Sequence, residues 1–334
     1  MKRVVVWLAS LALGACATVA PAPAATPPAC AMSAGDAAWV ERALSAWRYS
    51  AREITGIGRV EGFEAILFDH ACVLTSADAL NTQTAHWNAA LHGGAVPLPG
   101  GEEIPAGVVS FATAEQGRAF LVMSAPSVWR AGGVDNAGIG LETMMVAVLL
   151  HEGSHVAQVQ TYGARIGRIA EANHLPDDFN DDSIQRRFES NAEFAASVQR
   201  ETDLFFEAAA APDDAAARRL AREARALMQA RMQRFYTGAD AYLAEAEDVW
   251  LTMEGSGQFA GYRWLIDPQG GAAPADLALP HFARRSRWWS QNEGLGVFLA
   301  LERIAGPSWR RIVYGRGERT ALQLLDAALA APAR

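Results

Sequence analysis

One stretch of the chain, AVLLHEGSHVAQVQ at residues 147–160, places two histidines four positions apart in a mostly apolar run. The apolar residues MMVAVLL precede the first histidine, so we expect a buried helix over 141–162. Residues four apart lie on one face of an α-helix, one turn from each other. His151 and His155 can therefore both point at one ion, whereas Glu152 lies about 100° round the helix from His151.

This spacing is the one that an H-E-x-x-H zinc site requires. Two neutral imidazoles bind the ion, and the glutamate between them takes a proton from zinc-bound water. The alternative is a helix that buries two histidines with ordinary hydrogen-bond partners, because buried polar groups need such partners. A zinc site needs a third protein ligand, so the rest of the chain has to supply one.

The segment HEGSH resembles the zincin metallopeptidases, and more closely the glutamate-zincin branch, whose third ligand is a downstream glutamate. In many bacterial members that glutamate stands in a pattern like W-x-x-x-E-G-x-A/G. The chain contains the pattern twice, around Glu254 in WLTMEGSG and around Glu293 in WSQNEGLG. Glu193 in FESNAEF, or Glu189 just before it, lies nearer to His155 and at a separation typical of the branch. The resemblance implies a zinc-dependent hydrolase in which Glu152 is the general base.

The surroundings of these glutamates favour Glu254. It is the only charged residue between Asp248 and Arg263, and an ionised carboxylate in so apolar a segment is costly to bury unless it is paired or binds a metal. Gly255 and Gly257 leave room for another helix to come close. Glu293 follows the basic stretch ARRSRWW, whose arginines offer it a partner.

Glu193 and Glu189 lie among other charged residues on a helix, where a solvated role is easy. They stay open as alternatives to Glu254, as does Glu293. The separation between His155 and Glu254 is long for the branch. We therefore expect the helical hairpin of residues 185–235 to be an insertion.

The first residues read as an export signal. Residues 1–15 combine Lys2 and Arg3 with a short apolar run, and LGAC resembles a bacterial lipobox in which Cys16 would be lipidated. Residues 16–32 form a Pro/Ala-rich tether. These features predict an exported protein, anchored through Cys16 in the cell envelope, at the outer membrane facing the periplasm. Cys30 and Cys72 would then be free to pair in an oxidising compartment, with two separate thiols as the alternative.

The remaining chain predicts an α+β fold, with a small antiparallel β-rich N-terminal part and a mainly helical zincin-like part. We expect a helix over 36–50, strand-rich segments over 63–75 and 107–125, and further helices over 185–210, 213–235, 239–264 and 290–304. The first part would span 33–135 and the zinc-binding part 136–334. The strand RAFLVMSA, 118–125, stands where zincins pair a substrate backbone, or it is an interior strand.

The formal net charge of −8 makes nucleic acid an improbable partner. The sequence thus predicts a zinc-dependent metallopeptidase of the cell envelope that acts on a peptide or protein substrate. Two alternatives stay open. One is a non-catalytic lipoprotein with a structural zinc site, which a fourth protein ligand would close. The other is a hydrolase of a non-peptide amide.

Overall fold

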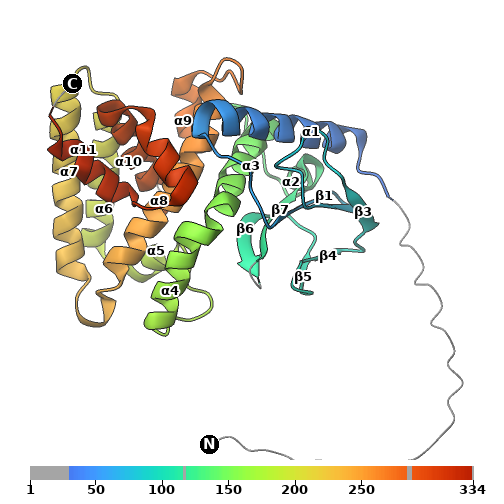
Figure 1. Ribbon diagram of the computed structural model, residues 1–334, viewed down its shortest axis with the longest axis horizontal. Coiled ribbons are helices and arrows are strands. Elements are labelled where there is room, and N and C mark those ends of the chain that lie inside the picture. The colour runs from blue at the N-terminus through green and yellow to red at the C-terminus, as the bar shows by residue number, and fades with distance from the viewer. Residues whose placement is uncertain (1–29, 116–117, 284–287, 333–334) are drawn as a thin grey trace, which may run out of the picture.

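The chain folds into an α+β structure in which a small mixed sheet precedes a mainly helical part (Figure 1). The computed structural model describes residues 30–115, 118–283 and 288–332. The predicted signal peptide, the predicted lipidation site Cys16 and most of the predicted tether lie outside these ranges, as do Arg284, Arg285 and Arg287. In the described part of the chain, no helix is both long and apolar enough to cross a membrane.

The main sheet has the strand order β3-β2-β1-β7-β6. Its strands are β1 Phe63–Phe68, β2 Cys72–Ser76, β3 Asn88–Leu91, β6 Ser110–Glu115 and β7 Arg118–Ser124. Neighbouring strands run antiparallel except β1 and β7, which are parallel, so the main sheet is antiparallel apart from this one pair. A parallel pair needs a long crossover, and the whole segment from β2 to β6 supplies it.

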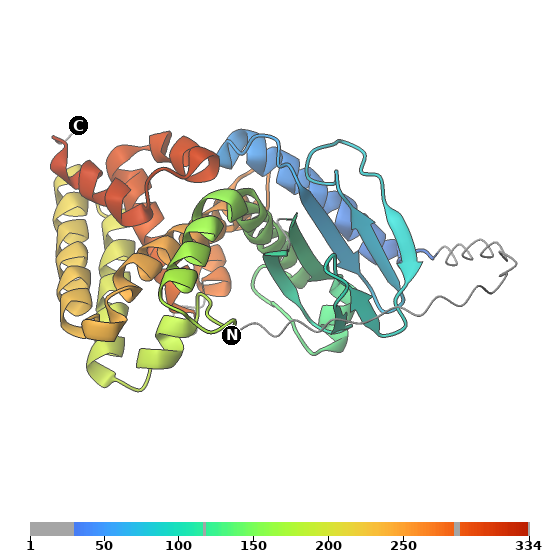
Figure 2. The ribbon, with the colours of Figure 1, turned by 60° about the horizontal axis from the view of Figure 1, so that its bottom comes forward.

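Successive side chains of β1 and β7 point to opposite faces of the sheet, and apolar residues occur on both faces, so both faces are covered. Leu67 and Met123 point to the main core, whereas Phe68 and Val122 point to a second cluster that contains Val96. Helices α1 (Ala34–Tyr49) and α3 (Leu141–Gln158) cover the first face (Figure 2). The small hairpin of β4 (Ala95–Pro97) and β5 (Glu103–Pro105) covers the second face.

β7 is paired on both sides, so the predicted strand at 118–125 is an interior strand, which ends at Ser124, and not the substrate-pairing edge implied by the zincin resemblance. The edge strand is β6, which packs against α3.

The helices largely follow the predicted segments, with breaks that local patterns did not reveal. Segment 185–210 divides into α5 and α6 at Ser190, and the side chain of Asn191 caps α6 by accepting hydrogen bonds from the Glu193 and Phe194 N–H groups. The remaining bounds are α2 Pro126–Ala131, α4 Ala164–Ala172, α5 Ser183–Phe188, α6 Ala192–Ala209, α7 Asp214–Phe235, α8 Leu243–Ile266, α9 Ala275–Phe282, α10 Trp289–Ala305 and α11 Ala321–Ala330.

Helix α8 is the centre of the helical part. It packs against α3 on one side and α10 on the other, while α6 and α7 pair as a hairpin beside α10 (Figure 1). The α8–α10 approach depends on glycine, because a Cβ built on Gly255 would lie 2.3 Å from the carbonyl carbon of Gly294. The expectation that Gly255 admits a neighbouring helix is confirmed.

The start of α1 is tied to the sheet. Cys30 and Cys72 form a disulfide with a Cα–Cα distance of 5.9 Å, which resolves the alternative left open by the sequence. The Ser33 N–H donates to Asp69 Oδ2 nearby. Together these contacts set where α1 crosses the sheet and reaches α3.

Candidate metal centre

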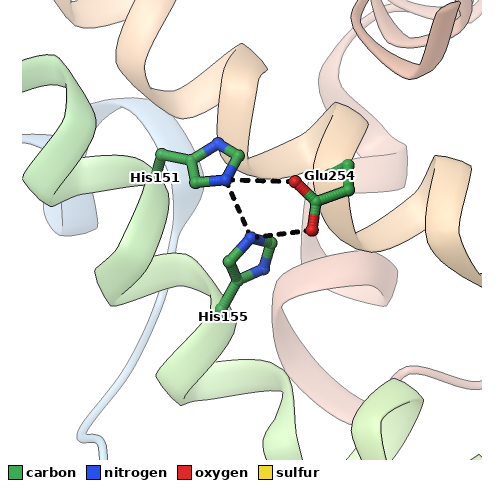
Figure 3. Close-up of side chains that lie close together, drawn as sticks. All are labelled: His151, His155 and Glu254. Atoms are coloured by element: carbon green, nitrogen blue, oxygen red, sulfur yellow. Dashed lines mark hydrogen bonds and ion pairs between the residues drawn. The ribbon is translucent and has the colours of Figure 1, made fainter. Parts of the chain in front are cut away.

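The two histidines lie where the buried half of α3 meets α8. Both rings point to the same side of the helix, and their Nε2 atoms are 2.8 Å apart (Figure 3). His151 and His155 are 6% and 7% exposed, so neither ring is solvated by bulk water. The expected helical spacing therefore brings two imidazole nitrogens close together.

Glu254 on α8 faces this pair of nitrogens (Figure 3). Its Oε2 lies 3.2 Å from His151 Nε2 and its Oε1 lies 3.1 Å from His155 Nε2. One ligand atom from each of the three residues lies within 4.8 Å of the others, and all three residues are buried. The structure thus brings together the residues that the sequence ranked first.

Close helix packing makes this convergence possible. A Cβ on Gly257 would be 2.7 Å from His151 Nδ1, so only glycine leaves space for the ring at this crossing of α3 and α8. On the other side of α3, a Cβ on Gly153 would be 2.4 Å from the Trp47 ring. The indole N–H of Trp47 donates to the Leu80 carbonyl, which fixes the ring against the motif helix.

The charges at the centre stabilise one another. Burial by itself would raise the pKa of the Glu254 carboxyl, but the charge of His155 and the hydrogen bonds from both histidines hold that pKa well below its usual range. Burial would lower the pKa of His155, yet the carboxylate of Glu254 outweighs it and raises the pKa to about 9. In the protein without a metal, protonated His155 and Glu254 therefore form a buried ion pair.

The donor set fits zinc. Bonds of about 2.1 Å to a tetrahedral ion separate ligand atoms by about 3.4 Å. The three observed separations, 2.8, 3.1 and 3.2 Å, are slightly shorter, so small side-chain movements would admit the ion. Two imidazoles and one carboxylate also match the ligand types that zinc prefers in catalytic sites.

The outer surroundings of the histidines are less complete. Zinc-binding histidines usually donate the second ring N–H to a carboxylate, carbonyl or water. In the described part of the chain, neither His151 Nδ1 nor His155 Nδ1 has a protein hydrogen-bond partner.

Glu152 lies beside the centre and does not join it. It is 8% exposed, and its Oε1 accepts a hydrogen bond of 2.8 Å from the Ser110 hydroxyl. Ser110 is the first residue of the edge strand β6, so this bond ties the glutamate to the sheet edge. Local patterns could not reveal Ser110, because the contact joins residues 42 positions apart.

A cavity of about 790 Å³ opens beside the centre. His155 and Glu254 line it, together with residues 112–114 of β6 and Trp250. Residues of α4 and of the loop that follows it complete the lining.

Asp181 of that loop also lines the cavity. Burial and the negative charge of Glu254 raise the pKa of Asp181 to about 8. Its neighbour Asp182 is the N-cap residue of α5, but its side chain makes no capping hydrogen bond. Part of the loop therefore belongs to the cavity rather than to solvent.

The alternative third ligands lie elsewhere. Glu189 is exposed at the end of α5, and Glu193 is exposed and pairs with Arg234 on α7. Glu293 is 1% exposed but faces Arg231, whose Nη2 lies 3.7 Å from its Oε2. The arginines at 284–287, which the sequence suggested as partners, lie outside the described residues.

Glu293 belongs to a buried polar cluster that sequence inspection missed. Arg231 donates to Glu201 at 2.7 Å and to Glu247 at 3.0 Å, and the Tyr236 hydroxyl donates to Glu247. Burial and the charge of Glu201 raise the pKa of Glu293 well above its usual range. The second W-x-x-x-E-G glutamate is therefore part of a helix-packing cluster, whereas the first is at the histidines.

Three further side chains that could donate a hydrogen bond beside a metal are Tyr262, His281 and Tyr314. The Tyr314 hydroxyl donates to the Ser256 carbonyl, and the His281 ring packs against Gly138. Tyr262 lines a different cavity, which lies between α6 and α8. None of the three lines the cavity beside His155 and Glu254.

Comparisons of the chain with models of protein families, with curated proteins and with solved structures found no match. The function therefore has to be inferred from the geometry of the site.

Proposed function

We propose that the protein is a zinc-dependent hydrolase whose substrate is a peptide. The observation that carries this proposal is the convergence of His151, His155 and Glu254. His155 and Glu254 line a large cavity, and Glu152 follows His151 directly on the same helix. His151, His155 and Glu254 would hold the ion. Bound zinc lowers the pKa of a water ligand and polarises a carbonyl group.

Glu152 is the general base in this proposal. Its buried carboxylate is held by the Ser110 hydroxyl at one oxygen, which leaves the other oxygen to take a proton from the attacking water. Because Ser110 belongs to the edge strand β6, its hydrogen bond fixes the Glu152 carboxylate relative to a peptide bound along that strand. The same residue can then return the proton to the leaving amine.

The edge strand supports a peptide substrate. β6 is paired with β7 on one side and is the last strand of the sheet on the other. Backbone groups at a sheet edge can bind an extended peptide as an added strand. Residues 112–114 of β6 line the cavity that reaches His155 and Glu254, so a peptide bound there would pass the metal centre.

The structural-zinc alternative expects a fourth protein ligand. Within the described ranges, the group of potential ligands contains His151, His155 and Glu254. Three protein ligands and a neighbouring cavity are typical of a catalytic rather than a structural site. A non-peptide amide stays open as the alternative substrate, because the chemistry would be the same.

The test is hydrolysis of a fluorogenic peptide library by the zinc-loaded protein and by Glu152→Gln. We expect Glu152→Gln to retain zinc and to lose about 10²- to 10⁴-fold in rate, as loss of a general base does. Glu142→Gln, in the first turn of the same helix, is the matched control and should hydrolyse at the wild-type rate. Hydrolysis by Glu152→Gln at the wild-type rate would contradict the proposal.

A further inference from the structure

A second cavity lies along α1, away from the metal centre. It measures about 640 Å³ and lies between α1, the loop at residues 83–84 and the turn that follows α8. Three arginines line it, Arg42, Arg48 and Arg52, and none of its described lining residues is a carboxylate. The cavity beside the metal centre is lined by several carboxylates instead, and the chain as a whole carries a formal charge of −8.

The helix itself arranges these cations. Arg42, Ser45, Tyr49 and Arg52 are spaced three, four and three residues apart, which places them along one face of α1 and the turn after it. The opposite face of α1 is buried in the core through residues such as Trp47. The core therefore fixes the orientation of α1, and this face of the helix lines the cavity.

The guanidinium groups keep free hydrogen-bonding capacity. Arg48 Nη1 donates to the Thr82 carbonyl at 3.2 Å, which positions the side chain and uses one of its five donors. Within the described ranges, neither Arg42 nor Arg48 forms an ion pair, whereas Arg52 pairs with the adjacent Glu53.

Besides Glu53, which pairs with Arg52, the carboxylate of Asp267 approaches this cavity. Its Oδ1 accepts hydrogen bonds from the Tyr49 hydroxyl at 2.8 Å and from the Gln269 N–H at 2.8 Å. Asp267 is therefore engaged with the cavity wall and does not pair with Arg42 or Arg48.

We propose that this cavity binds the phosphate group of a phosphorylated ligand. Planar guanidinium groups bind phosphate through paired charge-assisted hydrogen bonds, and the Ser45, Thr84 and Thr143 hydroxyls add neutral donors. A volume of about 640 Å³ exceeds that of a bare phosphate ion and suits a phosphate ester. The ester is either a free small molecule or a lipid headgroup, because the two present the same group.

Titration calorimetry of the full chain with inorganic phosphate at low ionic strength tests the site. We expect saturable binding that weakens about tenfold in Arg42→Gln and in Arg48→Gln, since each removes a charge-assisted contact. Arg219→Gln, an exposed arginine on α7, makes the same charge change elsewhere and should bind as wild type does. Circular dichroism of each variant checks the fold.

Flotation with phosphatidylglycerol vesicles and phosphatidylcholine vesicles separates the two sources. Binding to phosphatidylglycerol that phosphate displaces, and that Arg42→Gln weakens, identifies a headgroup. Phosphate binding without vesicle binding identifies a free phosphorylated compound. The proposal is overturned if neither probe binds in an arginine-dependent way, or if Arg219→Gln weakens binding as much as Arg42→Gln. The metal centre enters none of these readouts.

Discussion

Gly257→Ala should disable the metal centre without removing any ligand. The added Cβ would lie 2.7 Å from His151 Nδ1, whereas ordinary contact begins at 3.4 Å, so the ring would have to retreat by about 0.7 Å. Metal–ligand distances tolerate deviations of only about 0.2 Å. The ring of His151 cannot meet that tolerance while its backbone stays packed in α3.

We expect zinc affinity to fall by about 10- to 100-fold, the range seen when groups around metal ligands are changed. That range corresponds to about 1.4–2.7 kcal/mol of binding free energy. Unfolding of the zinc-free protein should be less affected. Overpacking lowers the free energy of unfolding by about 1–3 kcal/mol. The higher helix propensity of alanine relative to glycine raises it by up to about 1 kcal/mol, which offsets part of the loss.

The assay is competition for zinc with a chromophoric chelator, with urea unfolding of the zinc-free protein measured in parallel. Gly35→Ala is the matched control, because the nearest atom to its added Cβ, Ser33 Oγ, is 4.0 Å away. A folded Gly257→Ala protein that binds zinc as tightly as wild type would refute the assignment of His151 as a ligand.

Two further predictions concern charge. Glu293→Gln should change stability little, because burial and Glu201 keep the Glu293 pKa well above its usual range and glutamine mimics the neutral acid. Arg231→Gln should lower the free energy of unfolding by about 3–5 kcal/mol, because it leaves buried carboxylates unpaired. Equal urea midpoints for Glu293→Gln and Arg231→Gln would contradict this account of the cluster. In zinc-free protein, the His155 pKa is raised from 6.5 to about 9. Protonation of His155 therefore adds its full contribution to the free energy of unfolding below pH 6.5, and this contribution is lost as pH rises through 9. Unfolding free energy measured with chelator from pH 6 to pH 9.5 should therefore fall, whereas no pH dependence in this window would show that His155 and Glu254 do not form the pair.

The core of the site could be predicted because its signals are local. His151 and His155 are one helical turn apart, and Glu254 stands alone in an apolar segment, so each residue can be recognised without knowing the fold. The glycines at 255 and 257 likewise indicated close helix contacts, at Gly294 and at His151.

The parts that could not be predicted depend on distant contacts. Arg231 as the partner of Glu293, and Ser110 as the partner of Glu152, are set by how helices and strands pack rather than by nearby residues. The parallel pairing of β1 with β7 was missed for the same reason, because a strand's own residues do not reveal which neighbour it takes. The short helices α4 and α9 give too few turns for a clear periodic pattern.

Zinc stoichiometry of matched glutamate variants tests the central claim most directly. Glu254 and Glu293 stand in the same W-x-x-x-E-G pattern, so Glu254→Gln and Glu293→Gln are equivalent changes at the level of sequence. We predict about one zinc per chain by mass spectrometry of the metal in wild type and in Glu293→Gln, and its loss in Glu254→Gln. Zinc retained in Glu254→Gln, or absent from the wild-type protein after loading, would contradict the account.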